Sequence, residues 1–113
     1  MIGVDVVDVH RMRSVLDRSP RLAEKLFTEA ERAYCTRASD PVLHFAGTFA
    51  AKEAIVKALR LPSLLSWARR IEIVRDEDGV PAAHIEGRPD TVEISISHDG
   101  PVAVAVALRI IPR

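Results

Sequence analysis

Cysteine, net charge and long apolar runs are all scarce in this sequence. Cys35 is the only cysteine, so an intrachain disulfide is excluded. Its place beside Tyr34, with no histidine nearby in the sequence, favours a small packing residue over a nucleophile. The formal net charge of zero removes a global electrostatic reason to expect nucleic-acid binding. No apolar run approaches the length of a membrane span, so we expect no membrane partner.

The start of the chain also lacks a targeting signal. Residues 1–10 have neither the basic start nor the long apolar stretch of a signal peptide, which predicts a cytoplasmic location. The composition, 48% hydrophobic and 28% charged, is that of an ordinary globular protein. We expect one domain over residues 1–113, large enough to bury a core but with little surface to spare.

Apolar periodicity predicts one strand and then several helices in the first half of the chain. The β-branched run at 2–7 favours a buried strand. Thr28 and Glu31 have the spacing of a capping box, which predicts a helix to about residue 37. The other expected helices span 9–16, 21–27 and 42–59, the last being the longest and rich in alanine.

The second half of the chain alternates apolar stretches with turns. Strands are expected over 70–75, 80–85, 92–98 and 102–110, after a connection at 60–66. Turns are expected at 76–79, 87–90 and 99–100, where glycine and proline concentrate. This order predicts an α+β fold, with a mainly antiparallel sheet packed on one long helix and shorter helices.

Three polar residues occupy positions where the surrounding pattern calls for apolar ones. Asp5 interrupts the first strand, and an isolated buried charge there is too costly to stand without a partner. Its ordinary explanation is a cap for the following helix. Glu53 leans toward the apolar side of the long helix, and its ordinary explanation is an exposed ion pair with Lys57. His98 lies at the end of a strand, where functional residues are common. Its ordinary explanation is a half-exposed histidine beside a turn.

The same residue types would also suit a metal and phosphate site. Carboxylate oxygens are the ligands that Mg²⁺ prefers when it binds a substrate phosphate. A lysine and a histidine would hold phosphate oxygens as cations. The residues alone leave Mg²⁺-dependent phosphoryl chemistry open beside the ordinary explanations.

Basic residues outnumber acidic ones between His10 and Lys25. On composition alone a solvated helix face is favoured, and a docking patch for an acidic partner is the alternative. The basic residues there are Arg11, Arg13, Arg18, Arg21 and Lys25, opposed only by Asp17 and Glu24.

The segment FAAKEAIVKA at 49–58 resembles the signature F-A-A-K-E-A-x-x-K-A of the holo-acyl-carrier-protein synthases. The opening G-V-D at 3–5 resembles the family's G-x-D, and S-I-S-H at 95–98 resembles its S-x-S-H. The resemblance runs in order over essentially the whole chain. Shorter matches between these motifs are LFTEAE at 26–31, LSW at 65–67, IEI at 71–73 and DGVP at 78–81.

This resemblance implies a 4′-phosphopantetheinyl transferase-like fold and a known reaction. A carrier-protein serine attacks the β-phosphate of coenzyme A, and 3′,5′-adenosine bisphosphate leaves. Asp5 and Glu53 match the family's Mg²⁺ ligands, and Lys57 matches its pyrophosphate-contacting lysine. Either Glu53 or a water on the metal would accept the serine proton. His98, with its neighbour Ser97, matches the coenzyme A pocket.

The resemblance also implies partners. The family's single-domain members form homotrimers with active sites between subunits, so His98 would come from the subunit adjacent to the one that supplies Asp5 and Glu53. Arg11, Arg18 and Arg21 match the basic first-helix region that docks the acidic acyl carrier protein of fatty-acid or polyketide biosynthesis.

Two departures from the family pattern concern coenzyme A. Thr48 stands where arginine usually precedes the F-A-A-K-E string, and residues 60–63 replace a glycine-rich loop. Proline removes a backbone amide that a phosphate would use, although Arg60 would replace a lost charge. The alternative function is therefore a catalytically weak relative that binds carrier protein or coenzyme A. A purely structural domain would leave the three co-occurring motifs unexplained.

Overall fold

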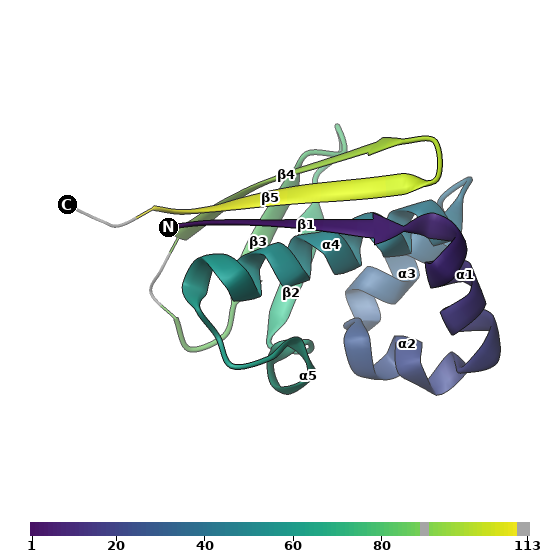
Figure 1. The fold of residues 1–113 in the computed structure, drawn as a ribbon, viewed down its shortest axis with the longest axis horizontal. Coiled ribbons are helices and arrows are strands. Elements are labelled where there is room, and N and C mark those ends of the chain that lie inside the picture. The colour runs from purple at the N-terminus through teal and green to yellow at the C-terminus, as the bar shows by residue number, and fades with distance from the viewer. Residues whose placement is uncertain (89–90, 111–113) are drawn as a thin grey trace.

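The computed structural model describes residues 1–88 and 91–110. One strand, a run of helices and four further strands follow one another, which confirms the predicted α+β order (Figure 1). The predicted turn at 87–90 includes Pro89 and Asp90, which lie outside the described residues. The elements are β1 (Ile2–Asp8), α1 (Val9–Arg18), α2 (Pro20–Leu26), α3 (Glu29–Arg37), α4 (Pro41–Leu59), α5 (Leu64–Trp67), β2 (Ile71–Arg75), β3 (Pro81–Ile85), β4 (Thr91–Asp99) and β5 (Val102–Ile110).

The strands form two antiparallel sheets. In the three-stranded sheet, β5 lies between β1 and β4, and β2 pairs with β3 in a separate hairpin. Asp5 of β1 stands opposite Ala105, and His98 of β4 stands opposite Ala103. Both alanines are buried, so the face that carries Asp5 is the face turned toward α4.

Helix α4 lies across the inner face of the three-stranded sheet, with α1 to α3 grouped at one end (Figure 1). The sheet and helix approach closely because small residues meet between them. A Cβ atom at Gly3 would overlap the carbonyl oxygen of Ala54, so β1 packs directly on the α4 backbone only with glycine at this position. Ala46, Ala50, Ala54 and Ala58 are all fully buried along α4.

Local sequence signals set the helix and hairpin ends. Asp8 Oδ1 accepts the backbone N–H of His10 at 2.9 Å and so caps α1. The capping box is confirmed, because Thr28 and Glu31 exchange backbone and side-chain hydrogen bonds. The hairpin turn between β2 and β3 is also confirmed, with Gly79 at a φ of +81°. The helix α5 begins within the segment 60–66 that was predicted as a connection and ends one residue beyond it.

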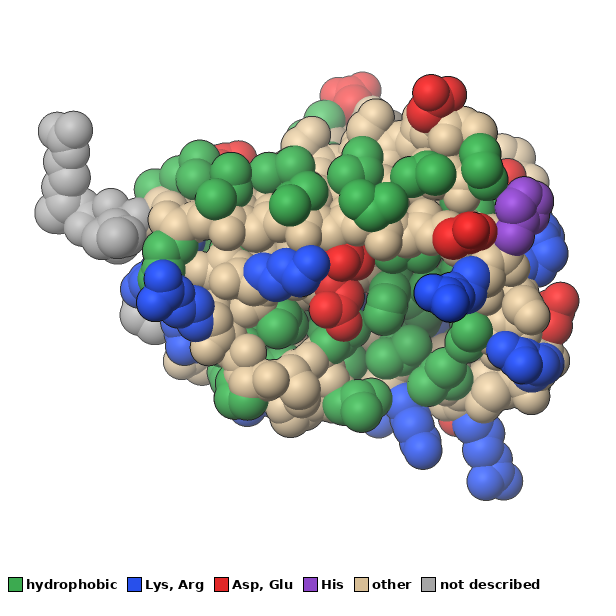
Figure 2. All heavy atoms as spheres, in the orientation of Figure 1, with side chains coloured by type: hydrophobic (Ala, Val, Ile, Leu, Met, Phe, Trp, Pro, Cys, Tyr) green, Lys and Arg blue, Asp and Glu red, His purple; other side chains and the backbone are tan. Residues whose placement is uncertain are grey.

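The outer face of the sheet is apolar over β1 and β5. On the face seen in Figure 2, apolar side chains form a row along these strands. Along β4 the outward residues are polar instead, namely Glu93, Ser95 and Ser97. None of the helices in residues 1–88 and 91–110 has the length and apolar character that crossing a membrane requires. The exposed apolar side chains of β1 and β5 are Ile2, Val4, Val6, Val102, Val106, Leu108 and Ile110.

Candidate active site

Asp5 and Glu53 meet where β1 packs on α4. The α1 cap is Asp8, so the explanation of Asp5 as a helix cap is wrong. Asp5 lies in mid-strand with 18% of its side chain exposed, and its Oδ1 lies 3.1 Å from Lys57 Nζ. The same ammonium donates a hydrogen bond to the Val4 carbonyl oxygen at 2.9 Å.

The partner of Lys57 is therefore not the one that helical spacing suggested. Within the described part of the chain, the ion pair of Lys57 is with Asp5 rather than with Glu53. Burial raises the pKa of the Glu53 carboxyl, the negative charge of Asp5 raises it further, and Lys57 lowers it. The two carboxylates are thus close enough to repel each other, which is the electrostatic condition that a bound cation relieves.

A cavity of about 380 Å³ opens beside the two carboxylates. Its acidic lining residues are Asp5, Glu53 and Asp8, of which Asp8 is engaged in capping α1, and Arg11 contributes a cation to the wall. The rest of the wall is mostly apolar, from α1, α2 and α4. The apolar residues include Met12, Val15, Leu22, Leu26 and Phe49. The cavity can therefore receive a ligand with a charged end and a less polar arm.

These two carboxylates would be the whole protein contribution to a metal site here. Among residues 1–88 and 91–110, no group of three or more His, Cys, Asp or Glu side chains is placed to hold a metal ion. Mg²⁺ is commonly held by one or two carboxylates, with waters and substrate phosphates completing its shell. Asp5 and Glu53 fit that donor set.

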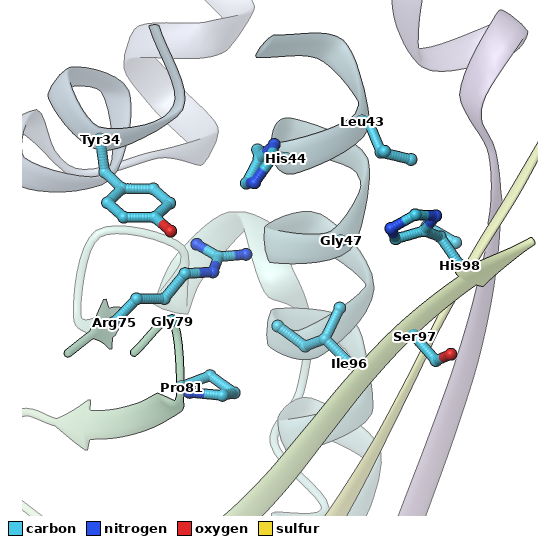
Figure 3. A pocket seen from close by; sticks show the side chains of 11 residues that line it. Tyr34, Leu43, His44, Gly47, Arg75, Gly79, Pro81, Ile96, Ser97 and His98 are labelled. Atoms are coloured by element: carbon cyan, nitrogen blue, oxygen red, sulfur yellow. The ribbon is translucent and has the colours of Figure 1, made fainter. Parts of the chain in front are cut away.

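His98 and Ser97 lie in a second cavity, of about 240 Å³, which is lined by other residues of α4, namely Leu43, His44 and Gly47 (Figure 3). This cavity is walled by β4, α4 and the β2–β3 hairpin and does not include Asp5 or Glu53. One copy of the chain therefore brings together Asp5, Glu53 and Lys57, but not His98.

The predicted docking arginines lie on or beside the first two helices. Arg11 lines the first cavity, whereas Arg18 and Arg21 are exposed. Arg18 donates from Nε to the Ser14 carbonyl oxygen at 3.4 Å. Arg60 ends α4 with a φ of +54°, a left-handed conformation that glycine usually supplies. The backbone at this helix end thus keeps a glycine-like shape with an arginine in place.

Known proteins resemble this chain over nearly its whole length. The sequence pattern of the 4′-phosphopantetheinyl transferase superfamily matches residues 1–107. The chain belongs to this superfamily. A holo-[acyl-carrier-protein] synthase of Chlorobaculum tepidum is 45% identical over 115 residues, covering 95% of each chain. A synthase of the same description from Salinispora arenicola is 44% identical, covering 95% of this chain and 94% of that one.

Solved structures of this superfamily agree with the fold. The Helicobacter pylori holo-[acyl-carrier-protein] synthase in complex with coenzyme A superposes with a TM-score of 0.81 at 28% identity, over 97% of this chain and all of that one. A Bacillus anthracis synthase in complex with CoA (3′,5′-ADP) has a TM-score of 0.80 at 32% identity, over 96% and 93%. The predicted phosphopantetheinyl transferase-like fold is confirmed.

Lys52 is a residue of the transferase signature whose place the sequence did not reveal. It is fully buried and forms an ion pair with Glu31. Its ammonium also donates to the carbonyl oxygens of Leu26 and Ala68, so all three of its protons have acceptors. Glu31 Oε2 accepts the backbone N–H of Ile73 at 2.7 Å. This network joins α4 to four other parts of the transferase fold, from the residue that precedes Glu53.

Thr48 and Cys35 belong to the core rather than to either cavity. Thr48 is fully buried, with its hydroxyl 3.8 Å from Cys35 Sγ. Burial raises the pKa of the Cys35 thiol, which confirms a packing residue rather than a nucleophile. The Thr48 side chain of this transferase therefore lines neither cavity.

Proposed function

We propose that the chain transfers 4′-phosphopantetheine from coenzyme A to a serine of an apo acyl carrier protein, giving holo carrier protein and 3′,5′-adenosine bisphosphate. The observation that carries this function is that Asp5 and Glu53 line one cavity, with Lys57 paired to Asp5, in a chain of this superfamily. The names of the relatives and the coenzyme A in the related structures support the same donor and acceptor.

Asp5 and Glu53 would hold a Mg²⁺ ion. When bound, this ion would neutralise charge on the pyrophosphate oxygens of coenzyme A. The support is the donor set itself, two carboxylate groups that repel each other and face one cavity. Two carboxylates leave room for phosphate oxygens and water, as a substrate-bound Mg²⁺ requires.

Lys57 and Glu53 supply the remaining chemistry from this chain. The Lys57 ammonium, held by Val4 and Asp5, would contact the pyrophosphate as a point charge. Glu53, which lines the cavity, or a water beside it would accept the serine proton. The serine Oγ–P bond then forms at the β-phosphorus, and the P–O bond to 3′,5′-adenosine bisphosphate breaks. Most of the rate enhancement would come from positioning and charge neutralisation.

The carrier protein would approach along α1 and α2. Arg18 and Arg21 are exposed there, and Arg11 lies at the mouth of the cavity that holds Asp5. Acyl carrier proteins are acidic, so these arginines would orient the carrier and bring its serine to Glu53. Carriers of fatty-acid and of polyketide biosynthesis both fit this surface chemistry.

We further propose a homotrimer, acting in the cytoplasm, with active sites between subunits. Two observations support the shared site. His98 lies in a different cavity from Glu53 within one copy, and the apolar outer face of β1 and β5 is exposed. Ile2, Val4 and Val6 are 68%, 52% and 63% exposed, so burying them against a second copy would stabilise association.

The test is an in vitro transfer reaction in which the mass of the carrier protein is measured by mass spectrometry before and after. The chain, coenzyme A, Mg²⁺ and an apo carrier are incubated, and the carrier is expected to gain the mass of one phosphopantetheine. A carrier with its acceptor serine replaced by alanine should gain nothing, and a chelator should stop the reaction. Coenzyme A binding without any gain in carrier mass would reject the enzyme and favour a binding module.

A further inference from the structure

The second half of α4 exposes one row of side chains, and all of them are charged. From Ala50 to Arg60, the residues that are not buried are Glu53, Lys57 and Arg60. Their spacing of four and then three residues places them one above the other on one face of the helix, with Arg60 at its C-terminal cap. Glu53 and Lys57 belong to the candidate active site, so Arg60 continues the row of that site by one turn.

The backbone of Arg60 has a conformation that usually belongs to glycine. Its φ of +54° and ψ of +43° lie in the left-handed region, where a Cβ atom comes too close to the following carbonyl oxygen. This conformation lets the Leu61 N–H donate to the Val56 carbonyl oxygen at 2.9 Å and close the helix end. Glycine would close it without strain, so arginine is not explained by the needs of the fold. In the described part of the chain the other residues with positive φ are glycines, namely Gly79, Gly87 and Gly100.

The Arg60 side chain also lacks an ionic partner that would account for it. It is exposed, and within residues 1–88 and 91–110 it forms no ion pair. The ordinary explanation is that a cation at the C-terminal end of a helix interacts favourably with the helix dipole. That explanation predicts an effect of the side chain on stability and none on the binding of a substrate.

We propose that Arg60 is a further substrate-binding residue, whose guanidinium binds the phosphate on the adenosine side of the coenzyme A pyrophosphate. This inference rests on the proposed transfer function. Figure 1 shows the C-terminal end of α4 pointing away from α1 to α3, along which the carrier would approach. A pyrophosphate with its transferred phosphorus beside Glu53 therefore has its other phosphate toward Lys57 and Arg60. Two parallel N–H groups of a guanidinium can bind two oxygens of that phosphate.

The experiment separates the side chain of Arg60 from its backbone conformation. Arg60→Ala and Arg60→Gly both remove the guanidinium, but only glycine relieves the left-handed conformation. Arg60→Lys keeps the charge and loses the planar fork. The control is Arg69→Ala, because Arg69 is also an exposed arginine and lines neither the first nor the second cavity. The melting temperature and the kinetics of transfer are measured for each variant and for the wild type.

Arg60→Ala and Arg60→Gly should raise the KM for coenzyme A by the same factor, about 10-fold, because both lose a charge-assisted contact. Arg60→Lys should be intermediate, and Arg69→Ala should match the wild type. Arg60→Gly should nevertheless melt about 3–6 °C above Arg60→Ala, because it alone loses the strain. An unchanged KM in both variants would overturn the proposal and leave the helix dipole as the role of Arg60. A rise in KM confined to Arg60→Gly would also overturn it, since the backbone and not the guanidinium would then be responsible.

A binding measurement separates this inference from the transfer function. By calorimetry, the wild type should bind adenosine 3′,5′-bisphosphate more tightly than adenosine 3′-monophosphate, which lacks only the 5′-phosphate, and Arg60→Ala should narrow the difference. That result in a protein without transferase activity would reject the proposed function and support the phosphate contact. Equal binding of the two nucleotides by the wild type, or a difference that Arg60→Ala leaves unchanged, would overturn the contact whether or not transfer occurs.

Discussion

Lys57 Nζ lies 3.1 Å from Asp5 Oδ1, although the two residues belong to different elements and Glu53 is only one helical turn away from Lys57. The same ammonium binds the Val4 carbonyl oxygen, so it is anchored to β1 rather than along its own helix. Glu53 is left with a raised pKa, because it is partly buried and faces the charge of Asp5. Within the described residues, Asp5 therefore has the lysine as its ion-pair partner, whereas the carboxylate of Glu53 has no ion pair.

The first prediction concerns stability against pH. A raised pKa means that folded Glu53 binds its proton more tightly than unfolded Glu53 does. The free energy of unfolding of the metal-free protein should therefore fall as pH rises from the ordinary value of 4.5 through the raised pKa. Glu53→Gln should remove this part of the decline, and Mg²⁺ should offset it in the wild type. Urea unfolding at a series of pH values measures both effects.

The comparison with Glu53→Gln is necessary because burial also raises the pKa of Glu31, which contributes a decline of the same sign. Only the difference between the pH dependences of the free energy of unfolding of the two proteins measures the contribution of Glu53. Parallel pH profiles for the wild type and Glu53→Gln would contradict the repulsion between Asp5 and Glu53.

Lys52 is predicted to be needed for stability. Lys52→Met should lower the free energy of unfolding by about 3–5 kcal/mol, because Glu31 is left as an unpaired buried charge. The matched control is Lys57→Met on the same helix, whose side chain is 52% exposed and whose ion pair should contribute about 0–1 kcal/mol. Urea unfolding measures both. Equal losses for the two variants would contradict the structural role of Lys52.

The arginines on α1 and α2 are predicted to act on the carrier protein. Replacing Arg18 and Arg21 by glutamate should raise the KM for the carrier about 10-fold at low salt and leave kcat nearly unchanged. The effect should shrink at high salt, because both side chains are exposed and screened. Arg37→Glu on α3 is the control. An unchanged KM at low salt would mean that α1 and α2 present only a solvated face.

Shared active sites predict complementation between inactive variants. When Glu53→Ala and His98→Ala proteins exchange subunits, some interfaces regain an intact Glu53 on one copy and an intact His98 on the next, so transfer should return. Light scattering should give the mass of three copies. Confirmed exchange without recovered activity would reject the shared site, and a monomer at working concentration would reject the trimer.

Much of the fold could be predicted from the sequence because its signals are local. The capping box at Thr28 and Glu31 and the glycine of the β2–β3 turn each act within a few residues, and both were confirmed. The short helix α5 was missed because four residues show no periodicity. The strands were predicted, but as one sheet, whereas the structure divides them into a three-stranded and a two-stranded sheet. Strand pairing depends on contacts between residues far apart in the chain, which local patterns do not reveal.

The candidate site was harder to predict because its contacts cross elements. Spacing gave Lys57 a partner on its own helix, but β1 packs so closely on α4 that Asp5 lies within reach instead. No pattern in the sequence marked Lys52 as buried, because α4 is enclosed on most sides and has no clear polar face. Arg75 ends a predicted strand, and only the fold places it across a cavity from His98.

The central claim is that Asp5 and Glu53 carry phosphopantetheine transfer, and the most direct test weighs the carrier protein after reaction with isosteric variants. Asp5→Asn and Glu53→Gln keep the size of each side chain, so both should remain folded while the yield of holo carrier falls at least about 100-fold with Mg²⁺ present. Asp17→Asn, on the exposed surface of α1, should match the wild type. Full conversion of the carrier by either site variant would contradict the claim.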